Sequence, residues 1–98
     1  MSDVEKTLGI FKALSCRARF DIVVELIKNQ GCNVGKIAQE LSIPKANIFE
    51  HLSILKKAGI VDGYRKGTQV FYKVEDQETK KIVMAFELKD WSDSRVLI

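Results

Sequence analysis

The stretch that decides the fold is KIAQELSIPKANIFEHLSILKKAGIV, residues 36–61. It holds two amphipathic helical patterns joined by the short break Ser42-Ile43. The first helix is short, and Asn33 ahead of it is a good N-cap. Pro44 suits the first position of the second helix, because its missing N–H needs no partner there. Two helices joined so closely predict a helix-turn-helix.

The second of these helices is predicted over residues 44–57 and ends at Ala58-Gly59. Its inward stripe is Ile48, Leu52 and Leu55, which recur every three or four residues. The opposite side is expected to be exposed, because successive side chains turn by about 100° along a helix. The exposed residues are Ala46, Glu50, Ser53 and Lys57.

Two more helices are predicted ahead of this stretch. Val4, Leu8 and Phe11 recur at helical spacing in a segment that ends near Leu14. Ser15 is the expected N-cap of the next helix, which stops at Asn29-Gln30-Gly31. The apolar stripe of that helix is Phe20, Val23, Val24 and Ile27.

After the helix-turn-helix the period changes to that of strands. Residues 61–65 and 68–74 are rich in β-branched and aromatic side chains, and Lys66-Gly67 between them predicts a two-residue turn. A final helix is expected from Gln77 to Trp91. Its apolar residues are Ile82, Val83, Met84, Ala85, Phe86, Leu88 and Trp91. This set is too wide for one stripe, so the helix needs a second partner, and the simplest is another copy of the chain.

Together these elements predict a mainly α fold with a small β-hairpin, in the order α-α-α-α-β-β-α. This is the order of a winged helix-turn-helix, here expected as one domain over residues 1–98. The first and last helices are expected to hold a homodimer together.

The net charge of +3 is modest, but its distribution is uneven. Residues 44–74 carry six cations against Glu50 and Asp62, so the basic excess falls on the second helix of the helix-turn-helix and on the hairpin. Such a cluster is typical of a surface that binds phosphates, although it also fits an ordinary solvated face.

Several classes of protein are excluded by what the sequence lacks. No stretch approaches the ~18 apolar residues of a bilayer span, and the polar start MSDVEK is unlike a signal peptide, so we expect a cytoplasmic protein. We find no phosphate-binding glycine loop and no nucleophile–histidine arrangement, and therefore expect no enzyme. The lone histidine, His51, is interpreted as structural.

Three segments resemble the ArsR/SmtB family of winged-helix repressors. They are FKALSCRARFDIVVEL (11–26), the helix-turn-helix quoted above with its His51-Leu52 pair, and RKGTQVFYKV (65–74). The resemblance covers about two thirds of the chain. It implies a homodimeric repressor that binds an operator with paired recognition helices and wings, and an inducer that loosens the DNA.

The recognition helix, residues 44–57, is expected to enter the major groove of DNA. The wing, residues 64–73, is expected to lie on the backbone or in the minor groove. On the helix, asparagine suits adenine, lysine suits guanine or phosphate, and glutamate accepts from cytosine. The candidates are Lys45, Ala46, Asn47, Glu50, Ser53, Lys57, Arg65, Lys66 and Gln69.

Two departures from the family pattern concern the DNA contacts and the sensor. Phe49 and Glu50 stand where the family has serine and then arginine or histidine, so the DNA sequence recognised is not carried over. These residues also suit an alternative, a winged-helix protein-interaction module without DNA binding. The family's metal ligands are largely missing, and two cysteines and one histidine are too few for a typical zinc site.

Cys16 and Cys32 are the candidate sensor thiols. If Ser15 caps its helix, Cys16 lies in the first turn beside Arg17 and Arg19, which predicts a thiol more acidic than usual. The two thiols could bind a thiophilic metal or arsenite, or respond to an oxidant, within one chain or across a dimer. The alternative is that neither cysteine senses anything.

Overall fold

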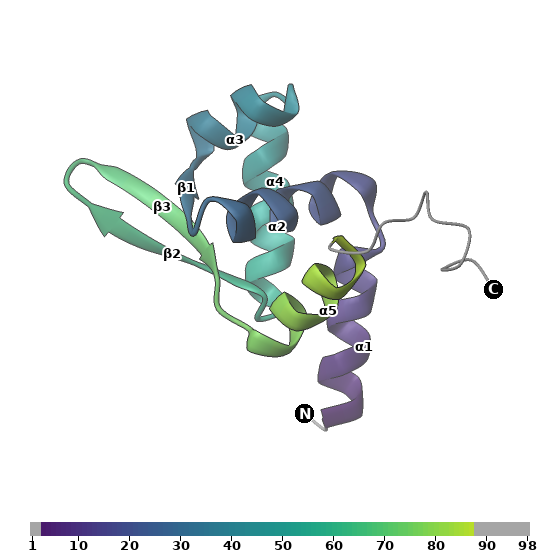
Figure 1. Cartoon of the computed structure of the whole chain (residues 1–98). Helices are drawn as coiled ribbons and strands as arrows, with labels where there is room; N and C mark the ends of the chain where they lie inside the picture. Colours follow the sequence, from purple (N-terminus) through teal and green to yellow (C-terminus); the bar gives the residue numbers. More distant parts are fainter. Residues whose placement is uncertain (1–2, 88–98) are drawn as a thin grey trace.

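The structure is a computed structural model in which residues 3–87 are described. Within this part the chain forms α1 (Asp3–Leu14), α2 (Arg17–Lys28), β1 (Cys32–Asn33), α3 (Val34–Leu41), α4 (Lys45–Lys57), β2 (Val61–Lys66), β3 (Gln69–Val74) and α5 (Gln77–Glu87) (Figure 1). The predicted order of helices and hairpin strands is confirmed. No helix among these residues is long and apolar enough to cross a bilayer.

The sheet has three strands rather than the two of the predicted hairpin. Its order is β1-β3-β2 and both pairings are antiparallel. The additional strand β1 has two residues, with Cys32 opposite Tyr72 and Asn33 opposite Phe71. The hairpin β2–β3 extends away from the helices, whereas β1 joins its base to the start of α3 (Figure 1).

The position of the hairpin turn differs by one residue from the prediction. Lys66 pairs with Gln69, so the two turn residues are Gly67 and Thr68 and not Lys66-Gly67. Gly67 has a φ of 66°, and glycine adopts this conformation without steric cost. A glycine at the first position of a two-residue loop matches the twist of the flanking strands.

Two predicted helix starts also need correction. The Ser15 hydroxyl does not cap α2, because it donates back to the Lys12 carbonyl at the end of α1, 2.9 Å away. Cys16 takes the N-cap position itself, in extended conformation. Pro44 is likewise the N-cap of α4 and not its first residue, and its carbonyl accepts from the N–H groups of Asn47 and Ile48.

The predicted ends of α3 and α4 are otherwise confirmed. Asn33 caps α3 by accepting a 2.8 Å hydrogen bond from the Lys36 N–H. Ser42 lies in the left-handed region, with φ 55°, and forms the break before α4. Ala58 ends α4, and Gly59 follows with φ 79°.

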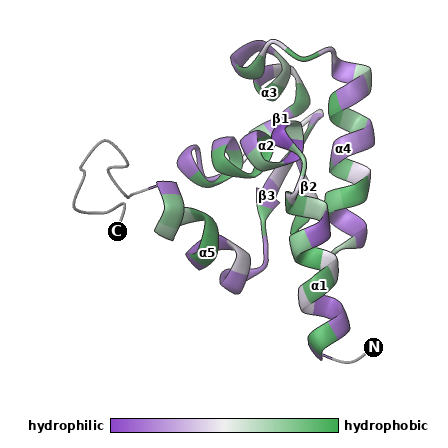
Figure 2. Cartoon of the chain, turned by 90° about the vertical axis from the view of Figure 1, so that its right-hand side faces the viewer, coloured by the Kyte–Doolittle hydropathy of each residue, from purple (hydrophilic) through white to green (hydrophobic). Residues whose placement is uncertain are grey.

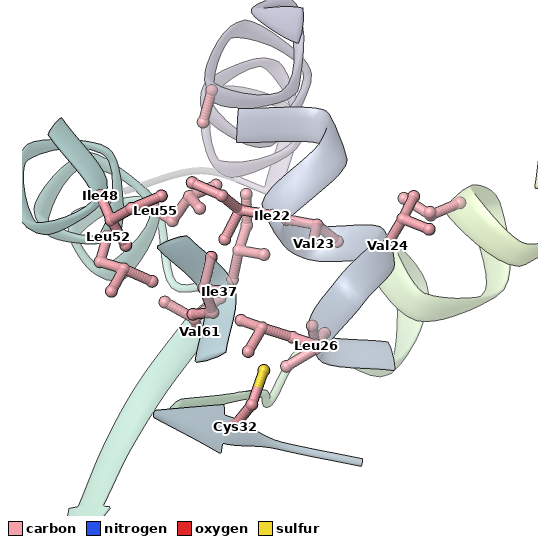
Figure 3. Close-up of a cluster of buried hydrophobic side chains, with 14 of the residues drawn as sticks. Ile22, Val23, Val24, Leu26, Cys32, Ile37, Ile48, Leu52, Leu55 and Val61 are labelled. Atoms are coloured by element: carbon pink, nitrogen blue, oxygen red, sulfur yellow. The ribbon is translucent and has the colours of Figure 1, made fainter. Parts of the chain in front are cut away.

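The core lies between α2, α3, α4 and the base of the sheet (Figure 3). Fully buried residues come from these three helices and from the loop before β2, and the apolar stripes of α2, α3 and α4 face one another there. They include Ile22, Leu26, Ile37, Ile48, Leu55 and Ile60. This packing fixes the orientation of α4, and therefore which of its side chains remain exposed.

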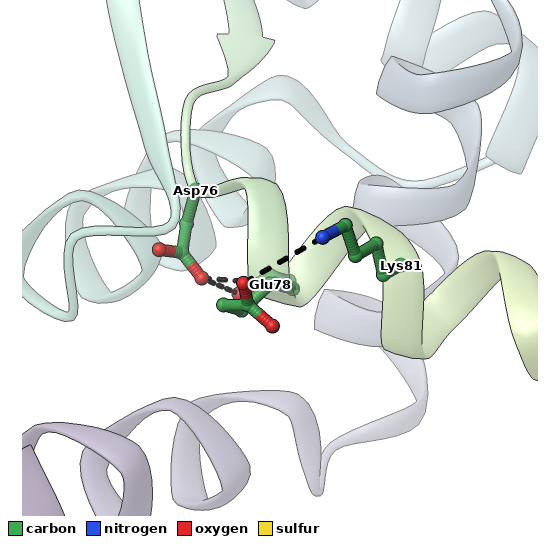
Figure 4. A network of polar contacts seen from close by, with 4 residues as sticks. Asp76, Glu78 and Lys81 are labelled. Atoms are coloured by element: carbon green, nitrogen blue, oxygen red, sulfur yellow. Dashed lines mark hydrogen bonds and ion pairs between the residues drawn. The ribbon is translucent and has the colours of Figure 1, made fainter.

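α5 begins on Asp76, whose carboxylate accepts from both the N–H and the hydroxyl of Thr79 (Figure 4). Val83 packs into the core, while Phe86 on the same helix is 54% exposed. Leu88 and Trp91, which the sequence placed in the last helix, lie outside the described residues. α1 and α5 both lie at the end of the molecule opposite α3 (Figure 2).

Candidate nucleic-acid interface

The exposed side of α4 carries all six candidate residues that the sequence placed on this helix. Ile48, Leu52 and Leu55 are buried, so the helix turns the remaining positions toward solvent. The exposed candidates are Lys45, Ala46, Asn47, Glu50, Ser53 and Lys57. The predicted amphipathic division of α4 is thus confirmed, while the DNA contact of each residue remains a prediction.

The cations of residues 44–74 fall into two groups. Lys56 has Asp62 as an ion-pair partner at 3.7 Å, and Lys73 has Glu75 at the same distance. The second group has no acidic partner within 4.0 Å among residues 3–87, and its members are Lys45, Lys57, Arg65 and Lys66. All four are exposed. Unpaired cations of this kind can neutralise phosphates without first breaking an internal ion pair.

A groove of about 470 Å³ separates α4 from the wing. Lys45 and Phe49 of α4 line one wall, and Gln69 and Val70 of β3 line the other. The start of α3 closes one end of the groove, together with Tyr72. The sequence predicted Lys45 and Gln69 as site residues, and the fold brings these two to the same groove.

The start of α3 adds positive potential to this groove. The Nζ of Lys45 lies 3.9 Å from the point that a Cβ on Gly35, in the first turn of α3, would occupy. A helix N-terminus carries partial positive charge on its N–H groups. A lysine ammonium beside such a terminus leaves the groove electropositive, and this favours an anion such as a phosphate.

Of the six candidates on α4, only Lys45 lines this groove. Lys57 is at the far end of α4, twelve residues or about 18 Å from Lys45, next to Glu5 and Lys6 of α1. Asn47 follows Lys45 by two residues, and this places it on another side of the helix. The fold therefore separates Lys45, at the groove, from the other α4 candidates.

The tip of the wing holds Arg65 and Lys66. Arg65 pairs with Val70 across the hairpin and Lys66 with Gln69, so both cations precede the Gly67-Thr68 turn. Below them Tyr64 and Phe71 stack with ring centroids 5.8 Å apart, and the Lys73 ammonium lies 5.5 Å from the Tyr64 centroid. These contacts stiffen the wing and leave Arg65 and Lys66 exposed at its end.

Most residues that line the groove are absent from the sequence-based site, and Asn33 and Phe49 are the most informative of them. Asn33 was assigned only as a helix cap, yet its Nδ2 donates a 2.9 Å hydrogen bond to Oε1 of Gln69. Phe49 was noted as a departure from the family pattern that also suits the protein-interaction alternative, and it was not among the predicted contacts, yet it is 53% exposed in this groove. Its position four residues after Lys45, on the same side of a helix, was the available signal.

The two candidate sensor thiols are not brought together. Cys16 caps the start of α2, and Cys32 lies in β1 beyond the end of this twelve-residue helix, which is about 18 Å long. Cys32 is buried against Leu26 (Figure 3). Residues 3–87 contain no group of three or more His, Cys, Asp or Glu that could hold a metal ion. A joint dithiol site within one chain is therefore ruled out by the distance.

The surroundings of the cysteines differ from the expectation in other ways. Arg17 donates to Asp21 at 2.9 Å, and Arg19 donates to the Ala13 carbonyl, so both arginines expected beside Cys16 have partners of their own. Burial raises the pKa of the Cys32 thiol above its ordinary value, and the nearby Lys36 opposes this effect. A buried thiol of raised pKa is less reactive than an exposed one, and this describes Cys32.

Comparison with known proteins places this fold in a regulatory family. The profile of the bacterial regulatory proteins of the arsR family matches residues 16–62. An HTH-type transcriptional regulator of Methanocaldococcus jannaschii is 42% identical over 83 residues, which are 85% of this chain and 93% of the relative. The HTH-type transcriptional repressor SmtB of Mycobacterium tuberculosis is 36% identical over 76% of this chain, but only 55% of that longer protein is covered.

A solved structure has the same fold. It is the solution NMR structure of the homodimeric winged helix-turn-helix DNA-binding domain Mb0332 of Mycobacterium bovis. The TM-score is 0.79 at 22% sequence identity, and the match covers 90% of this chain and 85% of that one. The arrangement of α3, α4 and the hairpin is therefore that of a winged helix-turn-helix.

Proposed function

The chain belongs to the ArsR family of bacterial regulatory proteins, and from this premise we propose that it represses transcription by binding an operator as a homodimer. As a member it is a DNA-binding transcriptional regulator. In the proposed complex α4 enters the major groove, and the wing formed by β2 and β3 lies along the backbone or the minor groove.

The observation that carries this proposal is the position of the unpaired cations. Lys45, Arg65 and Lys66 lie on the two elements that a winged helix presents to DNA, and none has an acidic partner within 4.0 Å among residues 3–87. The groove between these elements is electropositive at Lys45 and at the start of α3. A phosphodiester strand running between helix and wing would place its charges beside these groups.

The roles of the α4 residues differ with their position on the helix. Residues near the start of a recognition helix contact bases, so Lys45, Ala46, Asn47 and Glu50 are the proposed base contacts. Glu50 can accept from a cytosine amino group, and Asn47 can bind adenine with both of its polar atoms. Ser53 and Lys57, nearer the end of the helix, are proposed to contact the backbone, as is Gln69 at the base of the wing turn.

The proposed dimer rests on apolar residues of α1 that are exposed in the described part of the chain. Along α1, Val4, Leu8 and Phe11 are 67%, 61% and 47% exposed and form one stripe. The helix α5, to which the sequence assigned the other part of the interface, lies at the same end of the molecule as α1 (Figure 2). Such a stripe is a typical interface between identical copies, and a twofold axis would place two α4 helices in successive turns of the major groove.

A salt series on duplex DNA tests this proposal. The wild type is first used to select duplexes from a randomised library at about 50 mM salt, a condition that favours phosphate contacts. The affinity for the selected duplex is then measured by fluorescence anisotropy up to about 200 mM salt. We expect the logarithm of affinity to fall with slope near −0.9 per phosphate contact. Failure to retain any duplex at the lowest salt would reject DNA binding and favour the protein-interaction alternative.

A further inference from the structure

Phe49 is a large apolar side chain that the fold does not bury. It is 53% exposed, and it belongs neither to the buried core nor to the partly buried residues packed against that core in the described part of the chain. Exposing an aromatic ring to water has a free-energy cost, because its apolar surface stays hydrated. A single exposed apolar residue is common in proteins, so its position on the molecule is what carries an argument.

Phe49 lies on the recognition helix α4, in the groove between this helix and the wing. Ala46 lies three residues before it and Ser53 four residues after it, and both have short, exposed side chains. These spacings place all three on neighbouring parts of the helix surface. The ring therefore projects beyond its neighbours, with Lys45 one turn earlier on the same side.

We propose that Phe49 contacts the C5-methyl group of a thymine in the major groove and so determines part of the operator sequence. This inference rests on the proposed function, because it requires α4 to enter that groove. A phenyl ring has no hydrogen-bond donor or acceptor for base edges. Of the four bases, thymine alone presents an apolar group in the major groove, and phenylalanine is one of the side chains that contact it.

The charges around Phe49 favour DNA over a protein as its partner. Lys45, which lines the same groove, and Arg65 and Lys66, on the strand paired with β3, have no acidic partner within 4.0 Å in the described part of the chain. An apolar group on a protein could also bury the ring, but it would leave these cations without counter-charges. A thymine can bury the ring against its methyl group, and the phosphates of the same strand supply counter-charges to the cations.

Deoxyuridine substitution tests the contact directly, because it removes only the methyl group. Each thymine of the duplex selected by the wild type is replaced in turn by deoxyuridine. At one thymine in each half-site, the wild type is expected to lose about fourfold in affinity, the value for burying one methyl group. Phe49→Ala is expected to bind the thymine duplex more weakly and to bind both duplexes alike. Phe49→Leu, which keeps an apolar contact, should retain the preference.

Ile54→Ala is the matched control, because Ile54 is also an exposed apolar residue of α4, at 43%, but lies further from the groove. It should discriminate thymine from deoxyuridine as the wild type does. Equal wild-type affinity for every substituted duplex would overturn the inference while leaving DNA binding intact, as would unchanged discrimination by Phe49→Ala. If no duplex is selected at all, the proposed function fails and this inference fails with it.

Discussion

The side chain of Asn33 joins two parts of the chain that are 36 residues apart, because its Nδ2 donates a 2.9 Å hydrogen bond to Oε1 of Gln69. The Oδ1 of the same side chain accepts from the Lys36 N–H and caps α3. One residue therefore both starts the first helix of the helix-turn-helix and ties it to the wing. Both residues of this tie line the groove that also holds Lys45 and Phe49.

The two roles of Asn33 can be separated by mutation. Asn33→Ala removes both the cap and the tie, and is expected to lower the free energy of unfolding by about 1 kcal/mol. Asn33→Ser keeps a good cap but is too short to reach Gln69, and should retain most of the stability. Gln69→Ala removes only the tie. Urea unfolding measures all three, and equal decreases for Asn33→Ala and Asn33→Ser would contradict a separate capping role.

Most of the fold could be predicted from sequence because it rests on local periodicity. The helices and the hairpin strands each repeat apolar residues at their own period, as Ile48, Leu52 and Leu55 do in α4. Strand β1 could not be predicted in this way. It has two residues, too few for any period, and it exists only because Cys32 and Asn33 pair with Tyr72 and Phe71.

The predictions that were wrong in detail were decided by local interactions that the sequence pattern does not show. Ser15 is a good N-cap by residue type, but its hydroxyl donates to the preceding helix instead. The hairpin turn was placed one residue early because Lys66-Gly67 and Gly67-Thr68 both put a glycine in the loop, and only the strand register distinguishes them. The groove was only partly predicted, since its walls come from α4 and β3, twenty or more residues apart.

The wing cations are expected to contribute to affinity without contributing to sequence preference. Replacing Arg65 and Lys66 together with alanine should weaken binding to all duplexes about equally, and reduce the salt slope by about one for each phosphate that is no longer neutralised. Lys56→Ala is the control, because Lys56 already has Asp62 as a partner at 3.7 Å. A double variant that changes the preferred sequence instead would indicate that the wing reads bases.

The stripe on α1 is expected to hold the dimer. Sedimentation of the wild type at micromolar concentration should give about twice the chain mass of 11.1 kDa. Leu8→Glu places a charge within the exposed stripe, where an interface would have to bury it without a partner, so monomers are expected. Ile54→Glu makes the same change on exposed α4 and should remain dimeric. A monomeric wild type would reject the dimer altogether.

The two cysteines are expected to differ in reactivity. Cys16 is partly exposed, whereas Cys32 is 3% exposed and its pKa is raised by burial. Iodoacetamide near neutral pH should therefore modify Cys16 first, as followed by mass spectrometry of the intact protein. Cys16→Ser should leave one slowly reacting thiol and Cys32→Ser one fast one. The reverse order would mean that the segment around β1 opens readily.

The raised pKa of Cys32 also predicts how stability depends on pH. A thiol that is neutral and buried in the folded state, and that ionises more readily when unfolded, stabilises the fold fully below its pKa in the unfolded chain. This contribution is lost as the pH rises toward and through the pKa of the folded state, because the unfolded chain then gains a thiolate that the folded core disfavours.

Cys32→Ala removes the titrating group, so its free energy of unfolding should fall less than that of the wild type between pH 8 and about 10. Parallel curves for wild type and Cys32→Ala would show that Cys32 ionises equally in both states, and would remove the argument for a thiol sequestered in the core.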